Sequence, residues 1–532
     1  MTNTSKAPNS AAEKRGWFTR FLDTVEFLGN LLPHPVTLFA CFAIAVVLGS
    51  GIAAYFDVSA IDPRPEGAAG RAADGTIRVV SLMTVEGLHR IISNLVTNFT
   101  GFAPLGVVLV ALLGVSVAEH SGLISAAMRG LVMNASKRMV TVTIVFAGII
   151  SNTASELGYV VLIPMAALIF YSLGRHPLAG LAAAFAGVSG GYSANLFIGT
   201  VDPLLAGFTT SAANIIDPNY VVGPEANWFF MMASTFIIAI LGAFVTEKIV
   251  EPKLGKYNPA EASVNLGEQK LDPLTPAEKR GLKGAGLVFL GLCLLLAYSI
   301  VPADGILRNP DTGLVEGSPF LKGVVVFIFI TFGIPGYVYG RIVGTMKTDR
   351  DVIDAMAKSM SSMGLYIVLV FFAAQFVAFF GWSNLGAIMA VKGATLLQTI
   401  GLTGPEVFIF FIAMCAIVNL SLGSASAQWA IFAPIFVPML MIIGYSPEVI
   451  QAAYRIGDSV TNLITPMMSY FGLILAVAAR YKKDMGIGTL IATMLPYTLI
   501  FFIGWVIFFY IWVFLLGAPV GPNSPTFYEF TR

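Results

Sequence analysis

Charged side chains are scarce in this 532-residue chain, where Asp, Glu, Lys and Arg make up 11% of the residues and hydrophobic types 56%. A soluble domain carries about 25% charged residues. Together with the mean hydropathy of +0.80, this shortage excludes an ordinary soluble protein and predicts a polytopic protein embedded in a lipid bilayer. The net charge of +1 offers no basic surface for a nucleic-acid partner.

Cysteine and histidine are also rare. The three cysteines lie inside apolar runs, without the spacing of a disulfide framework or a metal site, and the four histidines are not grouped. The sequence contains no Gly-rich phosphate loop of the P-loop type, so ATP is not expected to be a direct energy source. We therefore expect no cofactor, and any coupled transport would draw on a proton or sodium gradient.

One enzyme-like motif is present. Residues 187–190, Gly-Val-Ser-Gly, fit the Gly-x-Ser-Gly pattern of intramembrane serine proteases. A nucleophilic Ser189 needs a base to activate it, and no histidine follows His176 in the chain. An intramembrane serine protease is therefore only a remote alternative. An ion channel is a third class, but it would not need the buried carboxylates and hairpins described next.

The most informative feature is a pattern that occurs twice, about 270 residues apart. Each copy has a short polar knot between two apolar runs, followed by a long apolar helix that polar residues interrupt. The knots are residues 151–155 (Ser-Asn-Thr-Ala-Ser) and 424–428 (Ser-Ala-Ser-Ala-Gln), and the interruptions lie at 191–203 and 457–466. A duplicated interruption of this kind points to the binding site of a secondary transporter.

The apolar runs beside each knot are too short to cross a membrane. A helix of about 12 to 15 residues rises only about 20 Å, whereas the hydrocarbon core is about 30 Å thick. Two re-entrant hairpins are therefore predicted, hairpin 1 over about 139–171 and hairpin 2 over about 407–443. The remaining apolar runs predict nine transmembrane helices, so the fold class is an all-α polytopic membrane protein.

The distribution of Lys and Arg orients these segments. A polar leader (1–26) and a basic linker (251–283) are predicted to be cytoplasmic, and they flank a first transmembrane half (27–250). The second half (284–516) ends in a periplasmic tail (517–532). Hairpin 1 then enters from the cytoplasm and hairpin 2 from the opposite side, which is the inverted repeat expected for alternating access.

Ionisable residues inside apolar runs are costly and mark functional sites. Glu156 directly follows the first knot, Asp202 ends the first interruption, and Arg455 and Asp458 stand in the second. Arg455 and Asp458 are three residues apart on one helix face, so they could form a structural ion pair. Alternatively, Asp458 or Asp202 is the proton- or cation-coupling carboxylate and Arg455 holds a substrate carboxylate. Glu156 is a further cation-coupling candidate. Trp429, beside the second knot, could stack on an aromatic ligand or simply pack in the core.

At these same residues the chain resembles the p-aminobenzoyl-glutamate transporter (AbgT) family, nearly end to end. The resemblance rests on LPHP at 32–35, NFTGFAPLG at 98–106, SNTASELG at 151–158, GRHP at 174–177, APIFVPM at 433–439 and YRIGDS at 454–459. Within the family the chain is more similar to the neisserial efflux-associated branch than to the enterobacterial importer.

The resemblance implies a homodimer in the bacterial inner membrane, with an ion gradient driving the movement of p-aminobenzoyl-glutamate or sulfonamide-type antimetabolites. Export is the favoured direction, and import of p-aminobenzoyl-glutamate or a dicarboxylate is the alternative. The family's functional positions fall on Asp202, Ser426, Trp429, Arg455, Asp458 and Pro466. Positions where related transporters place a coupling cation fall on Asn152, Asn195, Asn419 and Asn462, which makes these four residues a candidate sodium site.

Overall fold

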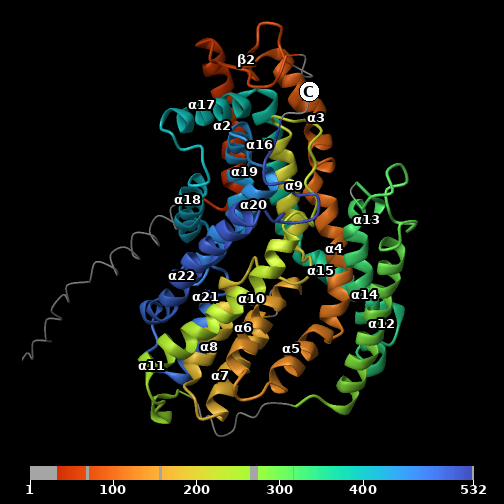
Figure 1. Cartoon of the computed structure of the whole chain (residues 1–532), viewed down its shortest axis with the longest axis vertical. Coiled ribbons are helices and arrows are strands. Elements are labelled where there is room, and N and C mark those ends of the chain that lie inside the picture. Colours follow the sequence, from red (N-terminus) through yellow and green to blue (C-terminus); the bar gives the residue numbers. More distant parts are fainter. Residues whose placement is uncertain (1–32, 67–70, 155–157, 264–272, 316, 530–532) are drawn as a thin grey trace, which may run out of the picture.

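Long apolar helices dominate the computed structural model, which describes residues 33–66, 71–154, 158–263, 273–315 and 317–529 (Figure 1). Within these residues, eight helical stretches are long and apolar enough to cross a membrane. They are α2 (Pro35–Tyr55), α3 and α4 (Val85–Thr100 and Ala103–His120), α10 with η4 and α11 (Trp228–Val245, Thr246–Val250 and Glu251–Leu254), α12 (Pro276–Ile300), α14 (Val324–Val343), α16 (Gly364–Trp382), α19 (Ala425–Ile442), and α22 with η7 (Ile487–Tyr510 and Ile511–Leu515).

Most of the shorter apolar helices build the two predicted hairpins and the two interrupted helices. They are α6 (Val140–Ser151), η1 (Asn152–Ala154), η2 (Gly158–Leu162), α7 (Ile163–Ser172), α8 (Pro177–Phe185), η3 (Ala186–Gly190), α9 (Val201–Ala213), α18 (Val407–Leu422), α20 (Pro447–Thr461) and α21 (Phe471–Tyr481). Helical segments fill the ranges predicted for the two hairpins, but α19 has 18 residues and is longer than the predicted short arm, because the helix begins inside the second knot. Glu156, a predicted cation-coupling residue, and the leader 1–26 lie outside the described residues.

Local sequence explains why hairpin 2 turns where it does. Gly423 ends α18 in the left-handed region, with φ +57°, a conformation that costs glycine nothing because it has no Cβ. Ser424 then caps α19 by accepting a hydrogen bond from the amide N–H of Ala427. The chain therefore reverses within two residues and presents the second knot at the hairpin tip.

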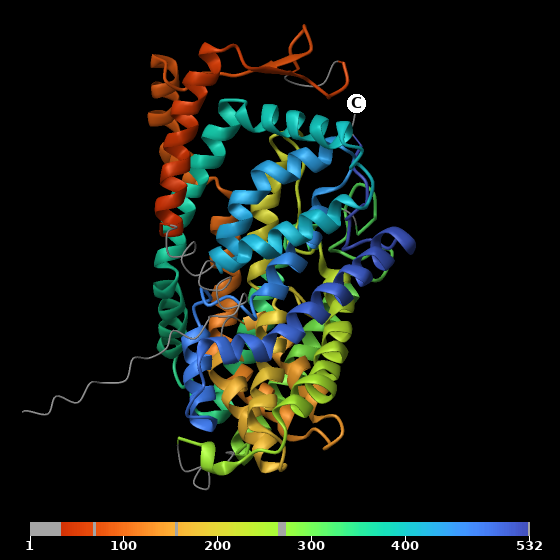
Figure 2. The ribbon, with the colours of Figure 1, turned by 90° about the vertical axis from the view of Figure 1, so that its left-hand side faces the viewer.

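The helices divide into an inner group and outer layers. The inner group holds both hairpins and both interrupted helices, packed with α10 and α22 around one large hydrophobic core. α4 packs on α14, and α14 on α12, along one side of it. α2 and α16 pack against each other and form a separate column, which Figure 2 shows at the left. The cavity described below lies where the inner group meets α4 and α16.

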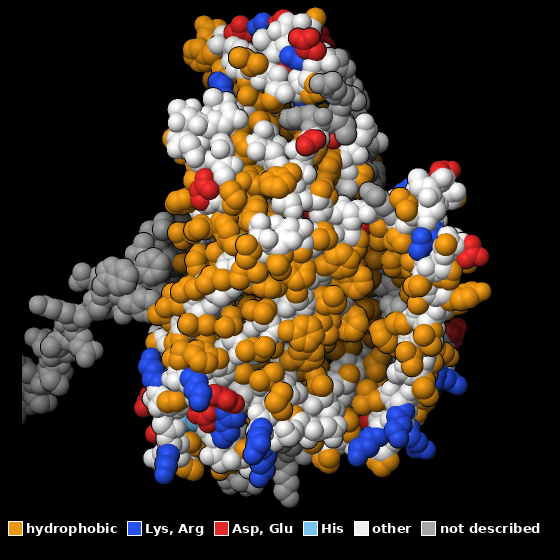
Figure 3. Space-filling model, in the orientation of Figure 1, with side chains coloured by type: hydrophobic (Ala, Val, Ile, Leu, Met, Phe, Trp, Pro, Cys, Tyr) orange, Lys and Arg blue, Asp and Glu red, His pale blue; other side chains and the backbone are white. Residues whose placement is uncertain are grey.

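A broad band of hydrophobic side chains covers the middle of the face in Figure 3. Lys and Arg gather at the end of the molecule that holds α11 and the start of α12, and the described C-terminal end lies at the opposite end (Figure 1). This separation is what the positive-inside rule predicts if the linker is cytoplasmic. The number of crossings, the entry side of each hairpin and the domain boundaries remain predictions.

Several local elements differ from the sequence prediction. A small antiparallel sheet, β1 (Ser59–Ile61) with β2 (Thr76–Arg78), pairs Ser59 with Arg78 in the segment after α2, so the fold is not strictly all-α. Strands of three residues are too short to produce a recognisable alternation of apolar and polar residues in the sequence. The other helices are α5 (Leu123–Met133), η5 (Pro259–Glu261), α13 (Pro319–Lys322), α15 (Asp349–Ser362) and α17 (Leu385–Thr399). α15 lies in a polar segment of the second transmembrane half and begins with a capping box between Thr348 and Asp351.

Candidate functional site

A cavity of about 330 Å³ lies between the tips of the two hairpins and the two helix interruptions. Polar groups of both repeats line it, among them Asn152 from the first knot, Ser426 from the second and Asn462 from the second interruption. Three of the residues predicted from sequence thus meet at one place. The rest of the lining is mainly aromatic and aliphatic, which is typical of a small-molecule site with a few polar contacts.

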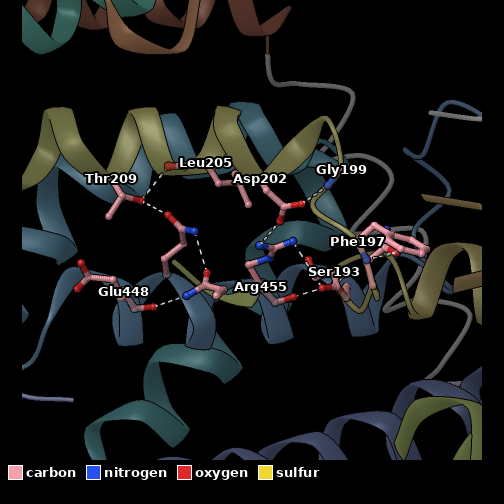
Figure 4. Close-up of polar contacts among 12 residues, drawn as sticks. Ser193, Phe197, Gly199, Asp202, Leu205, Thr209, Glu448 and Arg455 are labelled. Carbon is pink, nitrogen blue, oxygen red and sulfur yellow. Dashed lines mark hydrogen bonds and ion pairs between the residues drawn. The ribbon is translucent and has the colours of Figure 1, made fainter. Parts of the chain in front are cut away.

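Arg455 and Asp202 form a buried ion pair behind this cavity, with 2.6 Å between Nη1 and Oδ1 (Figure 4). The second Asp202 oxygen accepts a hydrogen bond from the amide N–H of Gly199 at 2.6 Å, and Arg455 also reaches the Ser193 carbonyl at 3.5 Å. The predicted alternative, an ion pair between Arg455 and Asp458, is therefore wrong. Arg455 is 3% exposed and does not line the cavity, so in this conformation it holds the two repeats together.

Asp458 is buried and forms no ion pair in the described part of the chain. Neither carboxylate oxygen has a hydrogen-bond partner there, and the amide oxygens of Asn419 and Gln428 are also buried without one. Burying an unpartnered charge is expensive, so such oxygens favour a bound proton or cation. Gln428 was not among the predicted site residues, although it ends the second knot.

Hydrogen bonds of the four predicted asparagines join each hairpin to its own interrupted helix. The Asn419 amide donates to the Asp458 carbonyl at 2.7 Å and to the Asn462 side chain at 2.8 Å. In the first repeat, the Asn152 amide donates to the Val188 carbonyl, and the Thr153 hydroxyl donates to Asn195. The repeats therefore share one plan with different partners. No group of three or more His, Cys, Asp and Glu residues gathers among the described residues to hold a metal.

Trp429 is completely buried, with its ring stacked on Tyr454 at 4.3 Å between centroids. Its indole N–H donates to the Thr209 hydroxyl at 2.9 Å. The structure thus places Trp429 in the core beneath the second knot, away from the cavity lining. Pro466 follows Thr465, whose hydroxyl donates to the Leu420 carbonyl and fixes the second interruption against hairpin 2.

A chain of hydrogen bonds leads away from Trp429, and sequence reasoning missed it. The Thr209 hydroxyl contacts Gln451, the Gln451 amide donates to Asn227 at 2.8 Å, and the Asn227 amide donates to the Glu448 carbonyl at 2.8 Å (Figure 4). These residues come from α9, the start of α10 and α20. Their polar neighbours in the sequence, such as Thr210 and Ser211 beside Thr209, gave no signal that singles them out.

A second cavity lies beside Glu448, where this series of hydrogen bonds ends. Glu448 and Glu225, which are 3% and 6% exposed, both line it, together with Lys322. The Glu448 carboxylate accepts hydrogen bonds from the Tyr220 hydroxyl, whereas one Glu225 oxygen has no partner in the described part of the chain. Burial raises the pKa of the Glu225 carboxyl, because the charged form is poorly solvated there.

The protease-like motif has a structural explanation. A Cβ on Gly187 would lie 2.3 Å from the Val145 carbonyl oxygen, so glycine allows η3 to cross α6 closely. The Ser189 hydroxyl accepts a hydrogen bond from the Tyr159 hydroxyl at 3.2 Å and itself contacts the Met468 sulfur at 3.0 Å. The residue is buried in helix packing with no histidine beside it in the described contacts.

The apolar helices, the two interrupted helices and the polar cavity between them fit a polytopic membrane transporter, and comparisons with known proteins agree. The family model described as "AbgT putative transporter family" matches residues 20–528. The chain therefore belongs to the AbgT family of membrane transporters, and it is not an enzyme.

Three relatives place it within that family. The chain is 38% identical to the p-aminobenzoyl-glutamate transport protein of Escherichia coli K12, over 98% of both chains. It is 65% identical to MtrF of Neisseria gonorrhoeae, which is described among a class of antimetabolite efflux pumps, with a TM-score of 0.90 over 95% of this chain and 100% of that one. The YdaH transporter of Alcanivorax borkumensis, described as having an unusual topology, matches at 46% identity with a TM-score of 0.85, over 92% and 100%.

Proposed function

We propose that this chain exports p-aminobenzoyl-glutamate and sulfonamide-type antimetabolites across the bacterial inner membrane, and that the cavity between the hairpin tips is its substrate site. The similarity to MtrF carries the proposal, because identity of 65% over the full length of an antimetabolite efflux pump is far above the 38% shared with the E. coli protein. The cavity adds physical support, since it combines aromatic walls with hydroxyl and amide groups.

We further infer that a proton or sodium gradient drives transport through Asp458. The four unpartnered oxygens of Asn419, Gln428 and Asp458 support this assignment, because a proton or cation there would offset the cost of burying them. Asn419 bonds directly to Asn462, which lines the cavity. Binding of the ion would therefore alter the position of a side chain that lines the proposed substrate site.

Import of p-aminobenzoyl-glutamate is the second candidate, favoured by the printed function of the E. coli relative. An importer and an exporter can use the same site and differ in how the ion is coupled. An importer would move its substrate in the same direction as the ion, whereas an exporter of this kind would exchange the two.

Flux in proteoliposomes tests these proposals. Labelled p-aminobenzoyl-glutamate and a labelled sulfonamide are followed under imposed proton or sodium gradients of either sign. The proposed exporter moves both ligands against the direction of ion flow. Movement with the ion would favour the importer, and no flux of either ligand under any gradient would refute the proposed function.

Asp458→Asn tests the coupling assignment in the same assay. The amide keeps the shape of the carboxylate but cannot take up a proton or balance a cation, so gradient-driven flux is expected to be lost. Asp354→Asn, on the exposed face of α15, is the matched control. Gradient-driven flux that persists in a folded Asp458→Asn protein would rule out Asp458 as the coupling carboxylate.

We also propose a homodimer with a cytoplasmic N-terminus and a periplasmic C-terminus. The basic linker and the described C-terminal end lie at opposite ends of the molecule, which supports the orientation (Figure 1). Single cysteines can be introduced in the C-terminal tail, and their labelling from outside in intact cells would test the orientation. Mass measurement of the purified protein in detergent would test the dimer.

A further inference from the structure

Two tyrosine rings from different repeats stack on each other in the wall of the cavity. Tyr159 stands in η2 of hairpin 1, and Tyr470 follows the second interruption, directly before α21. Their ring centroids are 4.7 Å apart and their planes differ by 4°. Both residues line the cavity between the hairpin tips. The pair therefore forms part of the wall that a ligand would meet.

Trp429 is not available for such contact. It is fully buried, its ring is stacked on Tyr454, and its N–H is bonded to Thr209. A ligand ring could reach it only by breaking all of these contacts. Tyr470, in contrast, is half-buried on a non-helical segment, so its ring can move with little loss of backbone hydrogen bonding.

The two tyrosines differ in how firmly they are held. The Tyr159 hydroxyl donates to Ser189, which also contacts Met468, so this ring is fixed from behind. An aryl group has the flat shape and the quadrupole of the ring that it would displace. A ligand ring entering the cavity can therefore replace the contact between the tyrosines, or lie between them, without exposing either ring to an unfavourable environment.

We propose that Tyr470 and Tyr159 form the aryl-binding subsite of this transporter, and that the p-aminophenyl group of the ligand stacks on Tyr470. The inference rests on the proposed function, because it assumes that the cavity takes an aromatic substrate. It also explains how one cavity serves both ligand classes. p-Aminobenzoyl-glutamate and sulfonamides share the p-aminophenyl group, whereas only the first carries a glutamate.

The polar groups beside the pair complete the subsite. Ser426, Asn462 and Ser469 line the same cavity and offer hydrogen bonds to a carbonyl or sulfonyl group attached to the ring. In this arrangement the ring supplies the shared affinity. The polar groups then distinguish ligands by what the ring carries.

Equilibrium binding to the purified full-length protein tests the subsite, with p-aminobenzoyl-glutamate and a sulfonamide as separate probes. Tyr470→Leu removes the ring, and we expect it to raise Kd for both probes by about tenfold, since a stacked ring and its buried area contribute on that order. Tyr470→Phe keeps the ring and should retain most of the affinity. Tyr298→Leu, on the exposed face of α12, is the control for loss of a tyrosine elsewhere.

Each outcome decides a different claim. Equal affinities of Tyr470→Leu and wild type, or equal losses in Tyr470→Leu and Tyr470→Phe, would overturn the aryl subsite while leaving the proposed function intact. If wild-type protein binds neither probe, both proposals fall.

Should Tyr470→Leu not fold, Tyr159→Leu replaces it, with Ser189→Ala as the control that removes the hydroxyl partner but keeps both rings. Tyr159→Leu should then weaken both probes and Ser189→Ala neither, and the reverse would overturn the subsite.

Discussion

Arg455 and Asp202 belong to different repeats, yet their side chains meet at 2.6 Å in the interior of the protein. Asp202 stands in the first turn of α9, and Arg455 stands in the middle of α20. The pair therefore joins the two interrupted helices directly. Any movement of one repeat against the other must stretch, exchange or break this contact.

Removing either partner is expected to destabilise the protein strongly. Asp202→Asn or Arg455→Gln leaves one buried charge without its counter-charge, at a cost of about 3–5 kcal/mol. The double variant removes both charges and should recover most of that loss. Thermal unfolding in detergent measures the effect. A double variant as unstable as the worse single one would show that the ion pair is not the main interaction of these residues.

Trp429→Phe separates a packing role from ligand stacking. The phenyl ring can still stack on Tyr454, but the hydrogen bond to Thr209 is lost, so we expect destabilisation of about 1 kcal/mol. Affinity for an aromatic ligand should stay near the wild-type value. Trp505→Phe is the control, because that buried indole also donates to a hydroxyl, that of Ser234, although the Trp429 N–H additionally reaches the Leu205 carbonyl at 3.3 Å. A large loss of affinity in Trp429→Phe alone would indicate direct ligand contact.

The helix breaks at the two knots and in the two interrupted helices could be predicted because their signals are local. A polar knot between two short apolar runs is visible in the sequence, and Gly423 with Ser424 determines the turn chemically. The β1–β2 sheet and α15 were missed because they are short and lie in polar segments, where hydropathy says nothing.

The partners of the site residues could not be predicted, because they depend on how the repeats cross in space. Spacing on one helix suggested Asp458 as the partner of Arg455, but the tertiary fold supplies Asp202 instead. The position of Trp429 beside the knot was compatible with ligand stacking and with core packing. In the structure its ring is buried against Tyr454. The tyrosine pair joins two segments that are distant in sequence and share no motif.

Glu225 predicts a pH dependence of stability. Burial raises its pKa in the folded state, so between the ordinary glutamate value and the raised value the folded protein holds a proton that the unfolded chain has lost. Stability therefore falls as pH rises through that window. Tyr220, Lys322 and Glu448 are the other titratable groups around this cavity or bonded to its lining, and Glu448 carries a charge of the same sign as Glu225.

Glu225→Gln should remove this pH dependence and raise the melting temperature at neutral pH relative to wild type. Melting curves at several pH values from 4.5 upward, in detergent, measure it. Glu66→Gln, at an exposed position in the segment between β1 and β2, is the control. A wild-type slope that survives in Glu225→Gln would assign the effect to another group.

His176 predicts a loss of stability in acid. Its Nδ1 caps α8 by accepting a hydrogen bond from the amide N–H of Leu178, which requires that this nitrogen carry no proton. Burial lowers the pKa of His176, and Lys482 acts in the same direction, while Glu261 and Glu251 oppose it. Below the ordinary histidine value the unfolded chain gains a proton that the folded state resists, so stability falls as pH decreases towards the lowered value.

A matched pair of variants isolates this effect, because His34 caps α2 in the same way, through Val36, at an exposed position. Asparagine is a good N-cap without a titrating group, so His176→Asn should keep the helix start and flatten the acid limb of the melting curve. His34→Asn should leave that limb unchanged. His176→Ala loses the cap at every pH, at a cost of about 1 kcal/mol. An acid limb unaltered in His176→Asn would show that this histidine does not control the stability of the start of α8.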